Sequence, residues 1–275
     1  MRISELSKLT STTEGTGQMP VLFVGHGNPM NAIENNEFTG GWRKSAESME
    51  KPSAILCISA HWETNGTFVT SMAKPKTIHD FGGFPQKLYE FQYPAPGNPE
   101  LAEEAKSLVP DGRVSLDDKW GLDHGTWSVL CQMYPDASIP VIQLSLDYNM
   151  PAQGHYDLAK ELTSLRKKGV LIIGSGNLVH NLREVDWSGK HESKGFDWAI
   201  EANDKIKSLI MANDHQQLIN YKKSGTAMGM AVPTPEHYLP LLYVLGLKHE
   251  SEKVTFFNDK SFMGSLSMTS VLVAG

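Results

Sequence analysis

The stretch MPVLFVGHGNPM, residues 19–30, places a short run of β-branched and aromatic residues directly before a histidine held between two glycines. A continuous apolar run of this length is typical of a strand that is buried on both faces of a parallel sheet. Similar runs recur at residues 54–59 (AILCIS), 140–146 (PVIQLSL), 170–175 (VLIIGS), 254–257 (VTFF) and 270–274 (SVLVA). We expect each of these runs to form a strand.

Helical patterns lie between several of the predicted strands. Residues 151–169 carry three leucines at helical spacing, residues 98–109 begin with an Asn-Pro pair typical of a helix start, and a third pattern spans residues 196–211. This alternation predicts an α/β fold with a largely parallel or mixed central sheet flanked by helices. No repeat or linker divides the chain, so we expect one domain over residues 19–275 after a flexible tail at residues 1–18.

Composition excludes several classes of protein. The 275 residues carry a formal charge of -6, and Lys and Arg are scattered, which argues against a nucleic-acid partner. No apolar run approaches the length that crosses a bilayer, and the N-terminus lacks the features of a signal peptide. The two cysteines, Cys57 and Cys131, are too few for a disulfide scaffold. We therefore expect a cytoplasmic protein without a membrane partner; its oligomeric state stays open.

Three histidines fall directly after predicted strands. His26, His61 and His180 follow the runs at residues 21–24, 54–59 and 170–175. The carboxyl ends of parallel strands form the edge at which ligands bind in open α/β sheets. Neutral imidazole is a common ligand for zinc, copper and iron. The pattern therefore predicts a mononuclear metal site at this edge, where Gly25 and Gly27 let the chain turn sharply off the strand.

The sequence gives weaker evidence of a functional role for the other histidines. His124 and His237 stand at or near predicted helix N-termini, where the helix dipole keeps an imidazole neutral and able to bind metal or accept a proton. His79 lies in residues 74–97, a segment rich in Pro, Gly and aromatics that we expect to be an ordered, functional loop. It either packs that loop or contacts a substrate. Four histidines in polar surroundings are expected to be solvated: His155, His191, His215 and His249.

Motifs for other chemistries are absent from the sequence. Ser175 has no Gly-x-Ser-x-Gly frame, so GSGNL is not a nucleophile elbow. The chain has no phosphate-binding loop that ends in Lys and Ser or Thr, and no HExxH pattern. Its two cysteines are too far apart for a paired-cysteine zinc motif.

Seven short motifs follow one another in the chain: GHGNPM, SAHWE, HDFGGFP, YPAPG, LDHGTW, GSGNLVHNL and PTPEHYLPLLY. Together they resemble the class III extradiol ring-cleavage dioxygenases, in particular the 4,5-DOPA dioxygenase extradiol branch. The resemblance covers almost all of the chain from Met19 to the C-terminus. A single GHG is a weak signal, whereas seven motifs in series are a specific one.

The resemblance implies one divalent metal ion per chain, Fe(II) for activity or Zn(II) in the isolated protein. It implies that O2 opens a catechol such as L-DOPA between carbons 4 and 5 to a muconic semialdehyde. The implied metal ligands are His26, His61, His180 and His237, and the implied acid–base residues are His124 and His180. His180 is thus a ligand or the base. Because the wider superfamily binds iron with two histidines and a glutamate, Glu236 beside His237 also leaves the third ligand open.

Two other functions compete with ring cleavage. The same cluster can hold zinc and activate water, as in a zinc-dependent hydrolase, which would work without oxygen. The fold is also shared with Memo-like proteins, which act as non-catalytic binding factors. The presence of all four candidate ligands argues against a degenerate site. We expect the small molecules bound to be a catechol and O2, with Phe81, Phe84 and Tyr93 of the aromatic loop as candidates for the wall of the pocket.

Overall fold

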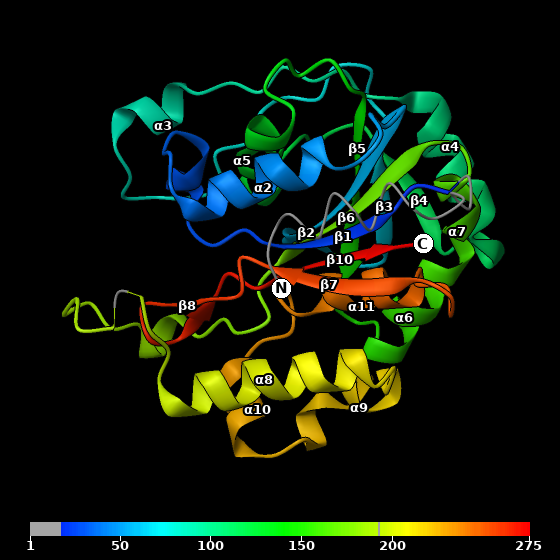
Figure 1. Cartoon of the computed structure of the whole chain (residues 1–275). Helices are drawn as coiled ribbons and strands as arrows, with labels where there is room; N and C mark the ends of the chain where they lie inside the picture. The colour runs from blue at the N-terminus through cyan, green and yellow to red at the C-terminus, as the bar shows by residue number, and fades with distance from the viewer. Residues whose placement is uncertain (1–17, 192) are drawn as a thin grey trace.

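The computed structural model describes residues 18–191 and 193–275, and its centre is an eight-stranded sheet (Figure 1). The predicted tail at residues 1–18 lies, apart from Gln18, outside the described residues. The strands of the sheet are β1 (Val21–Gly25), β2 (Ala54–Thr64), β3 (Thr67–Thr70), β4 (Val114–Asp117), β5 (Val141–Asp147), β6 (Val170–Gly176), β7 (Lys253–Phe257) and β10 (Ser270–Ala274). Two short strands pair separately, β8 (Ser261–Phe262) and β9 (Leu266–Ser267).

The sheet is mixed, with the strand order β4-β3-β5-β2-β6-β1-β10-β7. The four central strands β5, β2, β6 and β1 run parallel, whereas β3 pairs with β5, and β10 with β1 and β7, in antiparallel fashion. The predicted α/β fold with a largely parallel or mixed sheet is confirmed. Strand β1 illustrates why a continuous apolar run was informative: Val21 and Phe23 join the core on one face, and Leu22 and Val24 join the core on the other.

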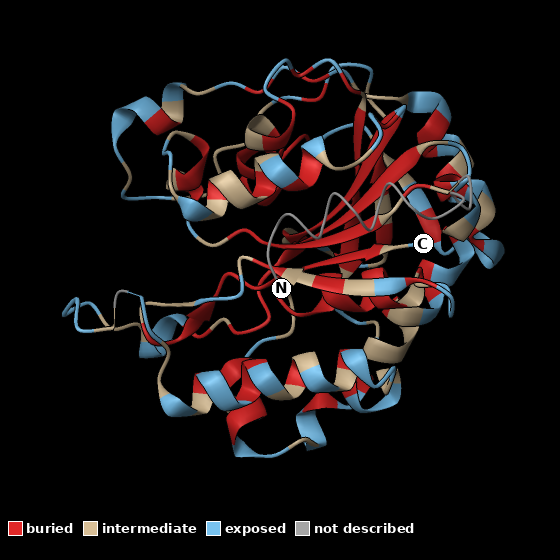
Figure 2. Cartoon of the chain, in the orientation of Figure 1, coloured by how far each residue is buried: buried red, intermediate tan, exposed pale blue. Residues whose placement is uncertain are grey.

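Helices cover both faces of the sheet and leave their polar sides exposed (Figures 1 and 2). One face packs against α2 (Glu37–Glu47), α3 (Gln86–Glu90) and α5 (His124–Met133). The opposite core contains residues of α4 (Pro99–Leu108), α6 (Ala152–Glu161), α7 (Thr163–Arg166), α8 (Asp197–Met211), α9 (His215–Ile219), α10 (Thr226–Ala231) and α11 (Leu239–Gly246). Short 3-10 turns are η2 (Pro29–Ala32), η3 (Pro110–Gly112), η4 (Leu182–Glu184) and η5 (Tyr221–Lys223).

The three predicted helices are present, with one correction. Helix α4 has Asn98 as its N-cap and Pro99 as its first residue, as expected, and α8 matches the third pattern. The pattern at residues 151–169 is not one helix, because it breaks at Leu162 into α6 and α7. The Leu162 N–H bonds to the Ala159 carbonyl three residues back, which is the tighter 3-10 pairing that often ends a helix.

Two further expectations need correction. The loop at residues 74–97 is ordered but contains α3, and the short strands β3 and β4 were not predicted. His155 is not solvated: it is fully buried, and its Nδ1 lies 3.0 Å from the Tyr243 hydroxyl of α11. Its sequence neighbours are polar, but α11 packs over this side of α6 and removes the ring from water.

Among the described residues, no helix combines the length and apolar character that membrane crossing requires. Cys57 and Cys131 are both free thiols. Burial raises the pKa of both thiols, Cys131 to about 12, so neither is poised as a nucleophile.

Candidate metal centre

His26 is placed by a sharp turn at the end of β1. Gly27 has φ +61°, a backbone conformation that favours glycine, and a Cβ there would overlap the Met268 sulfur. A Cβ on Gly25 would lie 2.7 Å from the Met268 backbone. Because neither glycine carries a side chain, the chain can turn off the strand in close contact with Met268. His26 stays buried at the carboxyl edge of the sheet.

His61 lies within β2 rather than after it. The pairing of β2 with β5 shifts register between Ile58 and Glu63, so the strand continues through Thr64 and carries His61 in the irregular segment. Irregular pairing of this kind often redirects a side chain next to a functional site. The prediction that His61 follows a strand end is therefore wrong in detail, although the residue does reach the expected edge.

His237 and His180 come from the other side of the centre. His237 precedes α11, and its carbonyl accepts a hydrogen bond from the Asn177 N–H just beyond β6. Its Nδ1 lies 3.1 Å from Glu236 Oε1. The ring of His180 stacks on that of His237, with centroids 3.5 Å apart and an interplanar angle of 9°.

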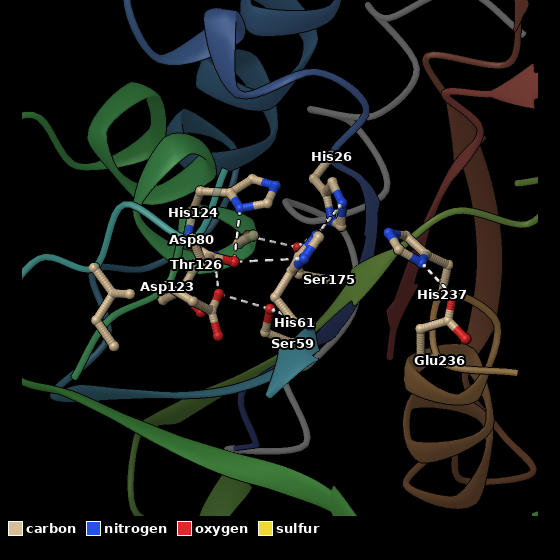
Figure 3. Close-up of polar contacts among 12 residues, drawn as sticks. His26, Ser59, His61, Asp80, Asp123, His124, Thr126, Ser175, Glu236 and His237 are labelled. Atoms are coloured by element: carbon tan, nitrogen blue, oxygen red, sulfur yellow. Dashed lines mark hydrogen bonds and ion pairs between the residues drawn. The ribbon is translucent and has the colours of Figure 1, made fainter. Parts of the chain in front are cut away.

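The side chains of His26, His61 and His237 converge (Figure 3). Their possible ligand atoms all lie within 4.8 Å of one another. His124 is close to this set, with its ring centroid 3.8 Å from that of His61, but it groups with His61 and Asp80 instead. His180 groups with Glu236 and His237. The structure thus brings all five predicted site histidines together. We call His26, His61 and His237 the central histidines, and His124 and His180 the lateral histidines.

Burial favours the neutral form of four of these imidazoles, those of His26, His61, His180 and His237. It lowers the pKa values of His26 and His237 well below the ordinary value, and neighbouring histidines lower them further. Burial likewise lowers the pKa of His61 to about 3 and that of His180 to about 4, although the charge of Glu236 opposes the shift at His180. Neutral rings are the form that binds a metal ion, so the cluster needs no deprotonation at neutral pH.

The hydrogen bonds of Ser175 determine which nitrogen of His26 carries the proton. The Ser175 hydroxyl donates to the Gly125 carbonyl at 2.6 Å, which uses its only proton. Its contact of 3.0 Å with His26 Nδ1 must therefore be a bond that the ring donates. The lone pair of neutral His26 is then on Nε2.

That lone pair faces another nitrogen, because His26 Nε2 and His61 Nε2 are 3.1 Å apart. When neutral His61 carries its proton on Nε2, its Nδ1 lone pair faces the Asp80 carboxylate at 3.5 Å, which is repulsive. When the proton is on Nδ1 instead, the Nε2 lone pairs of His26 and His61 face each other. Each neutral tautomer leaves one unfavourable contact, which a cation between the Nε2 atoms removes. Two imidazole nitrogens about 2.0–2.1 Å from one ion can lie this far apart, so the donor set fits a metal ion.

Two carboxylates beside the cluster, Asp80 and Asp123, had no predicted role. Asp80 bonds to His124, and fully buried Asp123 accepts hydrogen bonds from Ser59 and Gln143, each at 2.7 Å. Asp123 also caps α5, a signal that was readable from its place before a predicted helix start. Nothing local to HDFGGFP shows that Asp80 reaches a residue 44 positions away.

The fold and the histidine cluster define an α/β protein with a candidate metal centre, and comparisons with known proteins agree with this fold. The model of a family described as the catalytic LigB subunit of aromatic ring-opening dioxygenase matches residues 20–271. The chain belongs to this family. It is therefore an aromatic ring-opening dioxygenase of the class III extradiol type, and the prediction made from the seven motifs is confirmed.

Individual relatives cover nearly the whole chain. It is 47% identical over 262 residues to the Escherichia coli (strain K12) protein named 4,5-DOPA dioxygenase extradiol, with 93% of this chain and 95% of that protein covered. A Beta vulgaris protein of the same name is 36% identical over 253 residues, covering 90% and 93%. The crystal structure of an uncharacterized Escherichia coli K12 protein matches with a TM-score of 0.82 and 42% identity, covering 94% of this chain and 100% of that one.

Proposed function

We propose that this enzyme uses Fe(II) held by His26, His61 and His237 to open the ring of L-DOPA between carbons 4 and 5. The observation that carries the metal assignment is the 3.1 Å approach of two Nε2 atoms, because each neutral tautomer of His61 leaves an unfavourable contact either there or with Asp80. The names of the two relatives support the substrate. Both cysteines are free thiols, which supports the cytoplasmic location that is part of the same proposal.

The metal ion would supply redox chemistry and a binding site for the catechol oxygens, which the side chains alone do not provide. Fe(II) held by these residues would offer positions for the two catechol oxygens and would supply the redox chemistry toward O2 that zinc lacks. The three histidines are neutral ligands and leave the charge of the ion uncompensated, which favours a deprotonated catechol. Glu236 accepts the Nδ1–H of His237 at 3.1 Å, which leaves the His237 Nε2 lone pair for the ion.

His180 is the proposed base rather than a fourth ligand. Its ring stacks on His237, and it does not belong to the set formed by His26 and His61. Burial lowers the pKa of His180 to about 4, so the ring is neutral and can accept a catechol proton.

His124 is the proposed second acid–base group. It begins α5 on the opposite side of the central histidines, and its Nδ1 lies 2.9 Å from Asp80 Oδ2. A carboxylate at this position stabilises the imidazolium that forms when the ring holds a proton. His124 can therefore carry a proton to the opening ring.

The aromatic loop supplies an apolar wall next to His124. Phe81 meets the His124 ring edge-on at 5.5 Å between centroids, and Phe84 packs against Phe81 at 5.2 Å. This wall favours an aromatic substrate and excludes water. Tyr93 is instead buried, with its hydroxyl donating to the Tyr134 carbonyl, and His79 bonds to the Phe91 carbonyl; both hold the loop in place.

Oxygen uptake tests the proposal. Protein loaded with Fe(II) under argon is given oxygen and a panel of catechols, and the yellow ring-opened product is followed. We expect L-DOPA to be cleaved with one O2 consumed per ring. The proposal fails if no catechol supports oxygen uptake. Hydrolysis by the zinc form without oxygen would instead favour a hydrolase, and binding without turnover a Memo-like role.

Replacing His124 by Phe tests its role. The substitution keeps a ring of similar size but removes the proton carrier, so we expect kcat to fall by about 10²–10⁴-fold while metal affinity changes little. The exposed His249 provides the control, since His249→Phe should alter neither quantity. Unchanged turnover in His124→Phe would refute the acid–base assignment.

A further inference from the structure

One carboxylate oxygen of Asp80 lies within 3.5 Å of both a central and a lateral histidine. Asp80 Oδ2 lies 2.9 Å from His124 Nδ1 and 3.5 Å from His61 Nδ1, and Asp80 Oδ1 accepts the His124 backbone N–H at 2.9 Å. The side chain of Asp80 is 17% exposed. It therefore fixes one end of His124 through both ring and backbone and faces the far nitrogen of His61.

Its charge state suits this arrangement. Both of its oxygens accept hydrogen bonds from N–H groups of His124, one from the backbone and one from the ring, which suits an ionised carboxylate. Asp80 is thus an anion at neutral pH. An anion facing Nδ1 favours the tautomer with the proton on Nδ1, which turns a lone pair on Nε2 toward the neighbouring rings.

Occupation of the central site removes the conflict at His61. With its Nε2 lone pair directed to a metal ion, the ring keeps its proton on Nδ1, opposite Asp80. Carboxylate partners of this kind orient metal-binding imidazoles in many proteins. The same oxygen already accepts the Nδ1–H of His124.

We propose that Asp80 is a positioning residue that orients His61 toward the metal ion and His124 toward the substrate through one shared carboxylate. This inference rests on the proposed metal centre. Asp80 lies in the same loop as Phe81 and Phe84, so this loop both lines the pocket and places a carboxylate beside the histidines.

The test compares Asp80→Asn with wild type in a Zn(II) titration against a competing chelator. An amide keeps the shape and can accept the His124 N–H, but it cannot serve two ring donors as an anion. We expect about 10–100-fold weaker zinc binding. Asp118→Asn, which changes an exposed carboxylate in another loop, should bind as wild type does. Equal affinity in Asp80→Asn and wild type would overturn the proposal.

A double variant separates the two effects. His124→Phe alone should bind zinc within about threefold of wild type, and Asp80→Asn/His124→Phe should show the full loss of Asp80→Asn. In the iron-loaded enzyme, adding Asp80→Asn to His124→Phe should not lower kcat further at saturating metal. A further fall in kcat at full metal occupancy would contradict action through His124.

The wild-type chain provides a test that does not depend on how the variants fold. Long-range ¹H–¹⁵N spectra of the zinc-loaded protein should show His61 protonated on Nδ1 and metal-bound through Nε2. Metal binding through Nδ1 would overturn the inference. Failure of wild type to bind zinc or iron at all would instead refute the proposed function, so the two failures are distinguishable.

Discussion

At the scale of single residues, each proposed ligand has a different partner on its second nitrogen. His26 donates to a serine hydroxyl, whereas Nδ1 of His61 and of His237 each faces a carboxylate. A carboxylate partner makes an imidazole a more basic ligand than a hydroxyl does. We therefore expect His26 to be the weakest donor of the three.

Gly27→Val should disrupt the His26 turn. A side chain at φ +61° costs about 1–2 kcal/mol, and its Cβ would overlap the Met268 sulfur. We expect at least about tenfold weaker zinc binding, since the turn holds His26. Gly112 is a matched control: it has φ +65° with open space around it, so Gly112→Val should show the backbone cost without loss of affinity. Wild-type affinity in Gly27→Val would contradict this account.

His155 should contribute to acid sensitivity. Burial lowers its pKa from 6.5 to about 4, so below pH 6.5 the unfolded chain takes up a proton that the folded chain refuses. Stability from this group is complete above pH 6.5 and is lost as pH falls toward 4, by at most about 3 kcal/mol. In metal-free protein, His155→Gln should have a shallower fall in unfolding free energy over this range. The exposed His249→Gln should keep the wild-type slope, and an unchanged slope in His155→Gln would refute the assignment.

At the scale of elements, α5 sets the spacing of the centre. Asp123 caps the helix, His124 is its first residue, and Gly125 follows against β2. A Cβ on Gly125 would lie 2.5 Å from Ser59 Oγ and 2.9 Å from His61 Cδ2. The absence of a side chain at this position lets the helix approach the strand that carries a proposed ligand.

Two helical glycines should therefore respond in opposite ways to alanine. Gly40 lies in α2, and a methyl group added to it would have no neighbouring atom within 4 Å, so Gly40→Ala should stabilise the fold by about 0.5–1 kcal/mol. Gly125→Ala should instead displace His61, weaken zinc binding and lower the melting temperature. Chemical denaturation and zinc titration check both variants. A stabilised Gly125→Ala with intact affinity would contradict the proposed packing.

The same elements show what the sequence could and could not predict. Continuous apolar runs identified β1, β2, β5 and β6 because both faces of these strands are buried. The four-residue strands β3 and β4 contain Thr, Ser and Asp and give no such signal. Asp80 and His155 were missed for a related reason: their partners lie 44 and 88 residues away, and only tertiary packing brings them together.

At the scale of the whole molecule, the centre exists only in the folded chain. Its histidines come from the ends of β1 and β6, the irregular part of β2, the start of α5 and the segment before α11. An ion bound by them stabilises the native state, by about 2.7 kcal/mol at a free concentration of 100 times Kd. The parallel order of the central strands made this convergence predictable, whereas the division into three central and two lateral histidines was not.

Zinc should therefore raise the melting temperature of metal-free wild type by several degrees. His237→Ala removes one of the three proposed ligands and should lose most of this shift. Magnesium, which prefers oxygen ligands, should have little effect at the same concentration. Thermal unfolding scans with each ion measure these shifts. If zinc raised the melting temperature of His237→Ala as much as that of wild type, the proposed ligand set would be contradicted.

The most direct test of the central claim is the position of the ion in crystals loaded with Fe(II) under argon. Anomalous diffraction at the iron edge should give one peak per chain, at about 2.0–2.2 Å from the Nε2 atoms of His26, His61 and His237. A peak bound instead by His61, Asp80 and His124, or by His180, Glu236 and His237, would contradict the account.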